Sequence, residues 1–212
     1  MDRTPVASSQ FPDLTQIKNL FIHQRRELAE FFGFETRNKY EVVDGQGKVI
    51  AFAAEQGKGI LGLLIRGYLG HWRRFEIRFF NSQREVVLIA KHPFRFFFQR
   101  LEIYNPQEQL LGSIQQRFAV FSKKFDVEGE RGQLIFEIKS PFWSFWTFNF
   151  RRRGAVVASV KKKWSGGLTE LFTDRDNFLV EYQDVQLTQN ERILTLAAGM
   201  FIDLQYFERK AR

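Results

Sequence analysis

Residues 99–138 read QRLEIYNPQEQLLGSIQQRFAVFSKKFDVEGERGQLIFEI, and this stretch indicates the fold class most clearly. It contains two pairs of segments, each joined by a short polar turn: Gln99–Tyr104 with Leu110–Phe118, and Lys124–Glu128 with Leu134–Ile138. Apolar and polar residues tend to alternate along these segments, while Asn-Pro or glycine residues occupy the turns. Such alternation is typical of antiparallel strands with one buried face, so the stretch predicts two β-hairpins.

The same arrangement recurs along the rest of the chain. Three further pairs of segments flank short turns: Tyr40–Asp44 with Lys48–Ala53, Phe75–Phe80 with Glu85–Ala90, and Trp146–Phe150 with Ala155–Lys161. Segments near Leu20 and at Phe178–Tyr182 bring the expectation to about twelve strands. Short antiparallel strands in such numbers avoid unpaired edges by closing into a barrel. We therefore expect a mainly β fold, β-rich within the α+β class, built on a closed antiparallel barrel.

A barrel of that width has an interior that strand side chains alone do not fill. The segment Ile193–Phe207 (ILTLAAGMFIDLQYF) is apolar almost all round, which is typical of a helix buried on every side. Its helical length of roughly 22 Å is comparable with the height of a barrel. We expect a central helix over about residues 191–208, with Thr195, Gly199 and Asp203 on one face. A buried Asp203 would need a partner such as a barrel arginine.

Length and composition indicate a single domain. The chain has 212 residues, of which 44% are hydrophobic, and this is enough for one substantial core. Residues 1–12 are polar and interrupted by proline, so we expect a flexible tail there and the barrel domain over residues 13–212. The absence of cysteine from this sequence excludes disulfides, thiolate zinc sites, cysteine nucleophiles and palmitoylation.

No arrangement of residues in the sequence is typical of an enzyme. His23, His71 and His92 are scattered, without the spacing of a metal-binding motif. A nucleophile elbow and a phosphate-binding glycine loop are also missing from the sequence. We therefore expect that this protein is not an enzyme.

Aromatic residues gather in three segments beside basic residues: Gly59–Trp72, Pro93–Phe98 and Pro141–Phe150. Three consecutive phenylalanines cannot all lie on one face of a strand, so a strand at Phe96–Phe98 would be apolar on both of its faces. Because aromatic side chains favour the membrane interface, we predict membrane contact for these segments. The alternatives are burial in the core and an interface with a protein partner or a second copy. The predicted contact residues are Leu63, Leu64, Trp72, Phe94, Phe96, Phe97, Phe98, Phe142, Trp143, Phe145 and Trp146.

The chain is basic, with 32 lysines and arginines against 24 acidic residues and a net charge of +8. Such a balance favours anionic partners, and basic residues beside aromatic ones fit phospholipid headgroups. The predicted headgroup-binding residues are Arg73, Arg74, Arg95, Arg151, Arg152, Arg153, Lys161, Lys162 and Lys163. The alternative is a solvated basic face, and any binding of nucleic acid would be electrostatic and non-specific.

The sequence lacks an apolar secretory signal in its first dozen residues and an uninterrupted apolar run long enough to span a bilayer. We expect a cytoplasmic protein that associates peripherally with the inner face of a membrane.

Three stretches, Asn19–Glu55, Lys161–Tyr182 and Ala197–Glu208, together resemble the phospholipid scramblase family over most of the chain. The most specific motifs are GFET-x-NKYE, beginning at Gly33, and F-T-D-x-D-N-F, beginning at Phe172. The resemblance implies a tubby-like fold, in which a twelve-stranded barrel surrounds a hydrophobic C-terminal helix. It also implies ATP-independent, calcium-activated movement of phospholipids between leaflets. The alternative is a peripheral phospholipid- or phosphoinositide-binding adaptor or regulatory protein without transport activity.

The resemblance also implies a calcium loop over residues 174–185. Calcium favours several oxygen ligands, and carboxylates at alternate positions can converge on one ion. Leu179 and Val185 depart from the pattern of a calcium loop, because glycine and an acidic residue are expected there. The alternative is a structural junction in which Asp174 caps a turn or pairs with Arg175. The predicted ligands are Asp174, Asp176, Phe178, Val180, Glu181 and Asp184.

Overall fold

The computed structural model describes residues 10–24, 39–56, 74–120, 122–141, 147–162 and 177–206. These residues form twelve strands followed by one helix: β1 (Asn19–Gln24), β2 (Lys39–Asp44), β3 (Val49–Glu55), β4 (Phe75–Phe80), β5 (Val86–His92), β6 (Arg100–Tyr104), β7 (Leu110–Arg117), β8 (Ser122–Gly129), β9 (Leu134–Pro141), β10 (Thr147–Arg152), β11 (Ala155–Lys161), β12 (Phe178–Tyr182) and α3 (Gln189–Tyr206).

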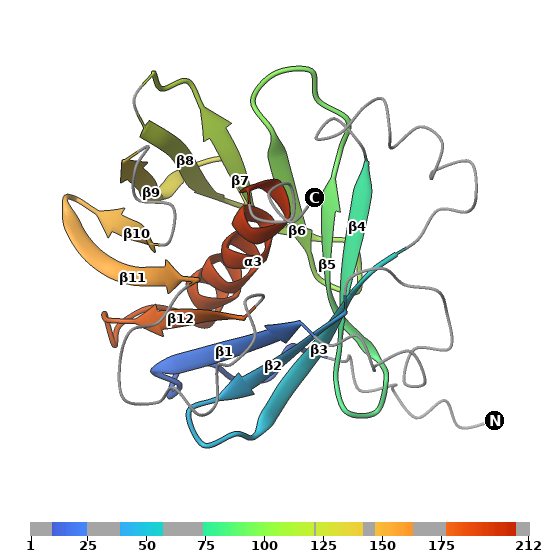
Figure 1. Cartoon of the computed structure of the whole chain (residues 1–212). Coiled ribbons are helices and arrows are strands. Elements are labelled where there is room, and N and C mark those ends of the chain that lie inside the picture. The colour runs from blue at the N-terminus through green and yellow to red at the C-terminus, as the bar shows by residue number, and fades with distance from the viewer. Residues whose placement is uncertain are drawn as a thin grey trace.

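The strands make one closed antiparallel barrel, which confirms the predicted fold (Figure 1). Each strand pairs with its neighbours in the sequence, and β1 closes the ring against β12, with Leu20 opposite Val180. Strand β9 continues beyond its predicted end at Ile138 to Pro141. It is longer because Lys139–Pro141 still pair with β8, a contact that local alternation does not reveal.

The antiparallel order divides the connections between the two ends of the barrel. One end carries five tight turns and the start of α3, and we call it the hairpin rim; its turns are residues 45–48, 81–85, 105–109, 130–133 and 153–154. The opposite end, which we call the loop rim, carries the connections that follow β1, β3, β5, β7, β9 and β11. All three aromatic segments singled out above therefore adjoin strand ends at the loop rim.

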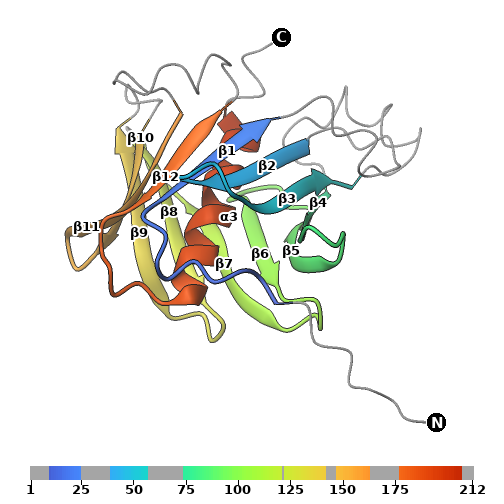
Figure 2. The same cartoon turned by 90° about the horizontal axis from the view of Figure 1, so that it is seen from below.

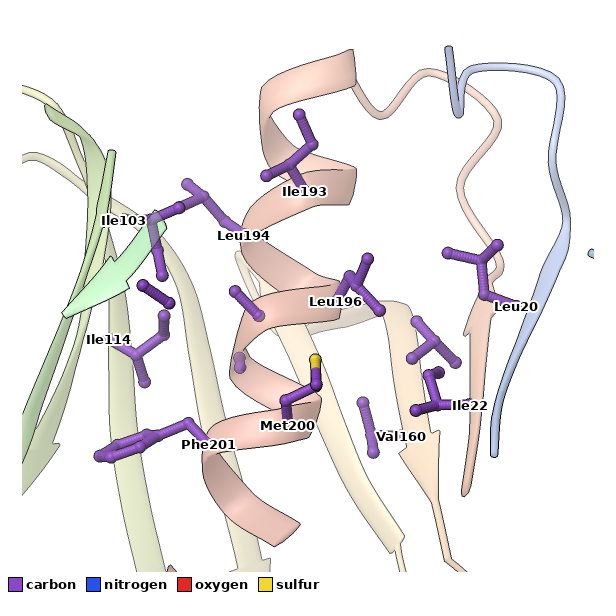
Figure 3. Packing of buried hydrophobic residues seen from close by; sticks show 14 of the residues in the cluster. Leu20, Ile22, Ile103, Ile114, Val160, Ile193, Leu194, Leu196, Met200 and Phe201 are labelled. Atoms are coloured by element: carbon purple, nitrogen blue, oxygen red, sulfur yellow. The ribbon is translucent and has the colours of Figure 1, made fainter. Parts of the chain in front are cut away.

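Helix α3 lies inside the barrel and runs along its length, which confirms the predicted central helix (Figure 2). Leu194 points toward Ile103 and Ile114, and Leu196 points toward the opposite wall at Leu20 (Figure 3). All five side chains are fully buried. The helix is apolar on every side because the barrel wall surrounds it and buries each of its faces.

The helix begins at Gln189, earlier than predicted, because residues before the apolar run form its cap. Thr188 and Glu191 make a capping box: the Glu191 carboxylate accepts from the Thr188 amide at 2.9 Å, and the Thr188 hydroxyl accepts from the Glu191 amide at 3.3 Å. The Gln189 side chain accepts from the Leu14 amide at 2.7 Å and donates to the Pro12 carbonyl at 2.8 Å. The start of α3 is thus fastened to the segment that precedes β1.

The predicted face of Thr195, Gly199 and Asp203 is partly described. The Thr195 hydroxyl donates to the Glu191 carbonyl at 2.8 Å, within the helix. A Cβ atom at Gly199 would lie 3.2 Å from both Phe178 and Val160, so this position lets α3 approach the wall closely. The side chain of Asp203 lies outside the described residues.

Candidate functional site

The connection between β5 and β6 presents a group of exposed phenylalanines at the loop rim. The exposed fractions are 58% for Phe96 and 76% for Phe97, with Phe94 and Phe98 also exposed. The rings of Phe94 and Phe96 are 5.9 Å apart, and those of Phe96 and Phe97 are 6.0 Å apart. Since most large apolar side chains of the described residues lie in the core, a contiguous exposed group is typical of a binding surface.

A second pair of exposed apolar residues lies in the neighbouring connection, between β7 and β8. Phe118 is 74% exposed and Val120 is 67% exposed. The two connections are tied together at their base, because the Gln115 side chain donates to the Phe98 carbonyl at 3.0 Å. Sequence reasoning missed this pair, although the run of apolar residues after Arg117 was a usable signal. We call Phe94, Phe96, Phe97, Phe98, Phe118 and Val120 the aromatic cluster.

Basic residues of the predicted headgroup set accompany the aromatic cluster at the loop rim. Arg95 lies within the cluster and is exposed, and Arg74 is exposed just before β4. Lys161 and Lys162, at the end of β11, are half-buried. The Lys161 ammonium pairs with the Glu181 carboxylate. Arg74 and Arg95 are therefore the described cations most available to an anionic surface at this rim.

Arg151, Arg152 and Arg153 lie at the other end of the barrel. Residues 153–154 form the tight turn between β10 and β11, which places the three arginines at the hairpin rim. Strand β11 separates them from Lys161 by roughly 20 Å, given the rise of about 3.3 Å per residue. The structure therefore divides the described members of the predicted headgroup-binding set between the two opposite rims of the barrel.

Several predicted residues lie outside the described part of the chain. For these positions the structure gives only the strand ends that their connections join: β3 and β4, β9 and β10, and β11 and β12, all at the loop rim. They are Leu63, Leu64, Trp72, Arg73, Phe142, Trp143, Phe145, Trp146 and Lys163.

The described members of the predicted calcium set do not gather at one point. Phe178 and Val180 are buried in β12, whose backbone pairs with strands on both sides. The Glu181 carboxylate is occupied by Lys161 and by the Ser159 hydroxyl at 3.1 Å. Asp184 accepts from the Gln186 amide at 2.9 Å in the connection to α3, at the hairpin rim.

Asp174 and Asp176 lie outside the described residues, in the connection that precedes β12. Among the residues that are described, no three His, Asp or Glu side chains lie close enough to hold a metal ion. Calcium binding by Asp174 and Asp176 stays a prediction.

Within the described ranges, no helix combines the length and the hydropathy needed to cross a membrane.

The described residues thus form a mainly β protein, in which a closed twelve-stranded barrel surrounds a buried C-terminal helix. One rim of this barrel carries the aromatic cluster and exposed arginines. The family model named Scramblase matches residues 3–209, so the chain belongs to the scramblase family.

Curated relatives agree with this assignment. "Phospholipid scramblase 2" of Bos taurus is 31% identical over 210 residues, covering 92% of this chain and 70% of the relative. "Phospholipid scramblase 1" of Rattus norvegicus is 30% identical over 211 residues, covering 92% of this chain and 62% of the relative. The chain thus spans somewhat less than two thirds of the rat protein. A solved structure from Arabidopsis thaliana matches 92% of this chain and 93% of its own at 12% identity, with a TM-score of 0.48.

Proposed function

We propose that the protein attaches to anionic phospholipid membranes through its loop rim and promotes ATP-independent movement of phospholipids between leaflets. The observation that carries this proposal is the exposure of Phe96 and Phe97 beside Arg95, at the loop rim of the barrel. We place the protein at the inner, cytoplasmic leaflet, where anionic phospholipids are concentrated.

The chemistry of the aromatic cluster suits attachment to a membrane. Transfer of a phenylalanine side chain from water to an apolar environment contributes about 1.5–3 kcal/mol when burial is complete. Each arginine near an anionic surface adds about 1 kcal/mol. Phe96, Phe97, Arg74 and Arg95 together would therefore support reversible peripheral binding. Lipid movement would follow from disturbance of lipid order around the inserted rings, without a catalytic step.

The second candidate is a peripheral phospholipid-binding protein without transport activity. The packing of α3 favours it, because the apolar surface of the helix is taken up by the barrel wall. Buried Arg192 also fastens the start of α3: its guanidinium donates to the Leu187 carbonyl at 3.1 Å and to the Ile17 carbonyl at 2.6 Å. In this candidate the loop rim binds lipid and the helix stays in place.

The calcium part of the proposal rests on Asp174 and Asp176. Their segment joins β12 at the loop rim, the same end as the aromatic cluster. Calcium bound there would add positive charge close to the membrane surface and strengthen attachment to anionic lipid. Glu181 would contribute only if Lys161 released it.

The experiment is phospholipid translocation in vesicles that contain phosphatidylserine, followed with a quenchable fluorescent phospholipid, with and without Ca²⁺. Flotation of the same samples measures binding separately. We expect Phe96→Ser/Phe97→Ser to lower vesicle binding about tenfold or more, because tenfold corresponds to only about 1.4 kcal/mol. The matched control is Val156→Ser/Val185→Ser, which removes exposed apolar side chains from the hairpin rim.

The outcomes separate the two candidates. Binding together with translocation that both depend on the aromatic cluster would support the transport proposal, and loss of translocation in Asp174→Ala/Asp176→Ala would support its calcium part. Binding without translocation would favour the lipid-binding protein. Equal binding by the native protein, the Phe96→Ser/Phe97→Ser variant and the control would overturn the assignment of the loop rim.

A further inference from the structure

A pocket of about 690 Å³ lies at the hairpin rim, opposite the aromatic cluster. It lies between the β8–β9 hairpin, the β10–β11 turn and the start of α3, and its size is within the usual range for small-molecule sites. Its lining includes Arg151, Arg152 and Arg153 together with Leu134 and Ile135. Three cationic groups beside an apolar wall therefore share one concave surface.

The three arginines are held in different ways. Arg152 pairs with the Glu191 carboxylate, and its guanidinium lies 5.1 Å from the centre of the Phe136 ring. One nitrogen of Arg151 donates to the Gly154 carbonyl at 2.8 Å. Arg153 is exposed and makes no hydrogen bond or ion pair with any described residue. The pocket thus has one fixed guanidinium and two with donors available to a ligand.

The balance of charge in the pocket favours an anion. Two carboxylates, Glu137 and Glu191, accompany the three arginines in the lining. Glu191 is already used by Arg152 and by the Thr188 amide, as described for the helix cap. Glu137 is exposed and lies across the strand pair from Arg151. The partial positive charge at the start of α3 adds to the remaining positive potential.

We propose that this pocket binds a small phosphate-bearing group, with Arg153 and Arg151 as its principal ligands and Arg152 as a fixed positive charge behind them. Guanidinium groups suit phosphate because their planar donors form two parallel hydrogen bonds to its oxygens. Leu134 and Ile135 would contact the apolar part of the ligand. The site is independent of membrane attachment by the loop rim, because the two rims face opposite ways.

The phosphate could belong to a soluble molecule or to a lipid headgroup, and two probes distinguish these sources. Inositol trisphosphate, titrated calorimetrically in the absence of membrane, tests the free phosphate. Flotation with vesicles of phosphatidylcholine and phosphatidylinositol bisphosphate tests the headgroup. Both are done near physiological ionic strength, so that weak surface pairing is screened.

Arg153→Gln is the test variant, and Arg84→Gln is its matched control. Both arginines occupy left-handed backbone positions in hairpin-rim turns, with φ of 50° at Arg153 and 65° at Arg84. Each substitution therefore removes one charge from the same rim and the same backbone conformation. Arg84 belongs to the β4–β5 turn and does not line the pocket. Thermal unfolding of both variants establishes that each is folded.

We expect saturable binding of at least one probe, weakened about tenfold or more by Arg153→Gln and less than about twofold by Arg84→Gln. Binding of inositol trisphosphate in solution would support a soluble ligand, and binding of the vesicles alone would support a headgroup where Arg153→Gln lowers it and Arg84→Gln does not. Absence of saturable binding of both probes, or equal losses in the two variants, would overturn the site. The solution titration does not bear on the loop rim, because it contains no membrane.

Discussion

The hydroxyl of Tyr182 donates to the backbone carbonyl of Arg192 at 2.9 Å, while the guanidinium of Arg192 lies 4.7 Å from the centre of the Tyr182 ring. One residue ends the barrel wall at β12, and the other lies in the first turn of α3. Burial raises the pKa of Tyr182 well above its ordinary value, so its hydroxyl stays protonated and able to donate. The pair fixes the start of the helix to the last strand.

Replacement of Arg192 should be strongly destabilising. Arg192→Met removes the donors to the Leu187 and Ile17 carbonyls and leaves both acceptors without these bonds. Since each hydrogen bond to a charged group contributes about 1.5–3 kcal/mol, we expect the free energy of unfolding to fall by at least about 3 kcal/mol. The control is Tyr182→Phe, which should lower the free energy of unfolding by only about 1 kcal/mol. Chemical denaturation of the two variants measures both changes. Equal losses in the two variants would contradict the central role of the guanidinium.

The close approach at Gly199 gives a prediction about side-chain size. A Cβ atom there would already be 3.2 Å from Phe178 and from Val160, and a longer side chain has no space toward the wall. Gly199→Leu should lower the free energy of unfolding by about 2 kcal/mol or more, because an overpacked core must distort. Gly199→Ala is the control and should be nearly neutral, since a gain in helix propensity of about 1 kcal/mol offsets the tight contact. Unchanged stability in Gly199→Leu would mean that α3 lies further from β11 and β12 than the structure places it.

The ion pair between Lys91 and Glu108 gives a prediction about pH. The Lys91 ammonium lies 2.8 Å from the Glu108 carboxylate, and this hydrogen bond holds the pKa of Glu108 below its ordinary value of 4.5. Because the pKa of Glu108 is lower in the folded protein, its ion pair stabilises the fold above about pH 4.5. This stabilisation is lost as the pH falls through the pKa that Glu108 has in the folded protein. Lys91→Met should therefore raise the pKa of Glu108 and remove that part of the acid sensitivity.

Carboxyl NMR titration measures this change directly. Asp13 is the internal control, because its lowered pKa depends chiefly on hydrogen bonds from Thr15. The pKa of Asp13 should stay the same in Lys91→Met while that of Glu108 rises. A pKa of Glu108 that does not move would mean that the two side chains are not paired in solution.

Much of the fold could be predicted from the sequence because the barrel is built from local hairpins. Five turns join strands that are adjacent in the chain, so alternation and turn residues carry the information. The apolar character of Ile193–Phe207 similarly reveals a helix enclosed on all sides. The start of the helix was less clear, because Thr188 and Glu191 act through backbone amides just before the apolar run. The contact between Arg192 and Ile17 joins distant parts of the chain and has no local signal.

The candidate site could be predicted only in part. Composition indicates where aromatic and basic residues gather along the chain, but not which end of the barrel each group reaches. Phe97 and Arg153 lie at opposite rims because an odd number of strands, β6 to β10, separates their connections. Counting the predicted hairpins would have revealed this division. The pocket at the hairpin rim has no such signal, since it combines β9, the β10–β11 turn and the start of α3.

The central claim is that the loop rim attaches the protein to membranes that contain phosphatidylserine. The sequence contains no cysteine, so a single introduced thiol can carry an environment-sensitive fluorophore at one chosen position. Phe97→Cys places the fluorophore in the aromatic cluster, and Val185→Cys places it at a similarly exposed apolar position on the opposite rim.

The decisive measurement is the emission of each labelled protein with phosphatidylserine vesicles, together with quenching by brominated lipid. The account predicts a blue shift and strong quenching at position 97, with little change at position 185. Insertion of the fluorophore at position 185 but not at position 97, or equal and weak responses at both, would contradict the account.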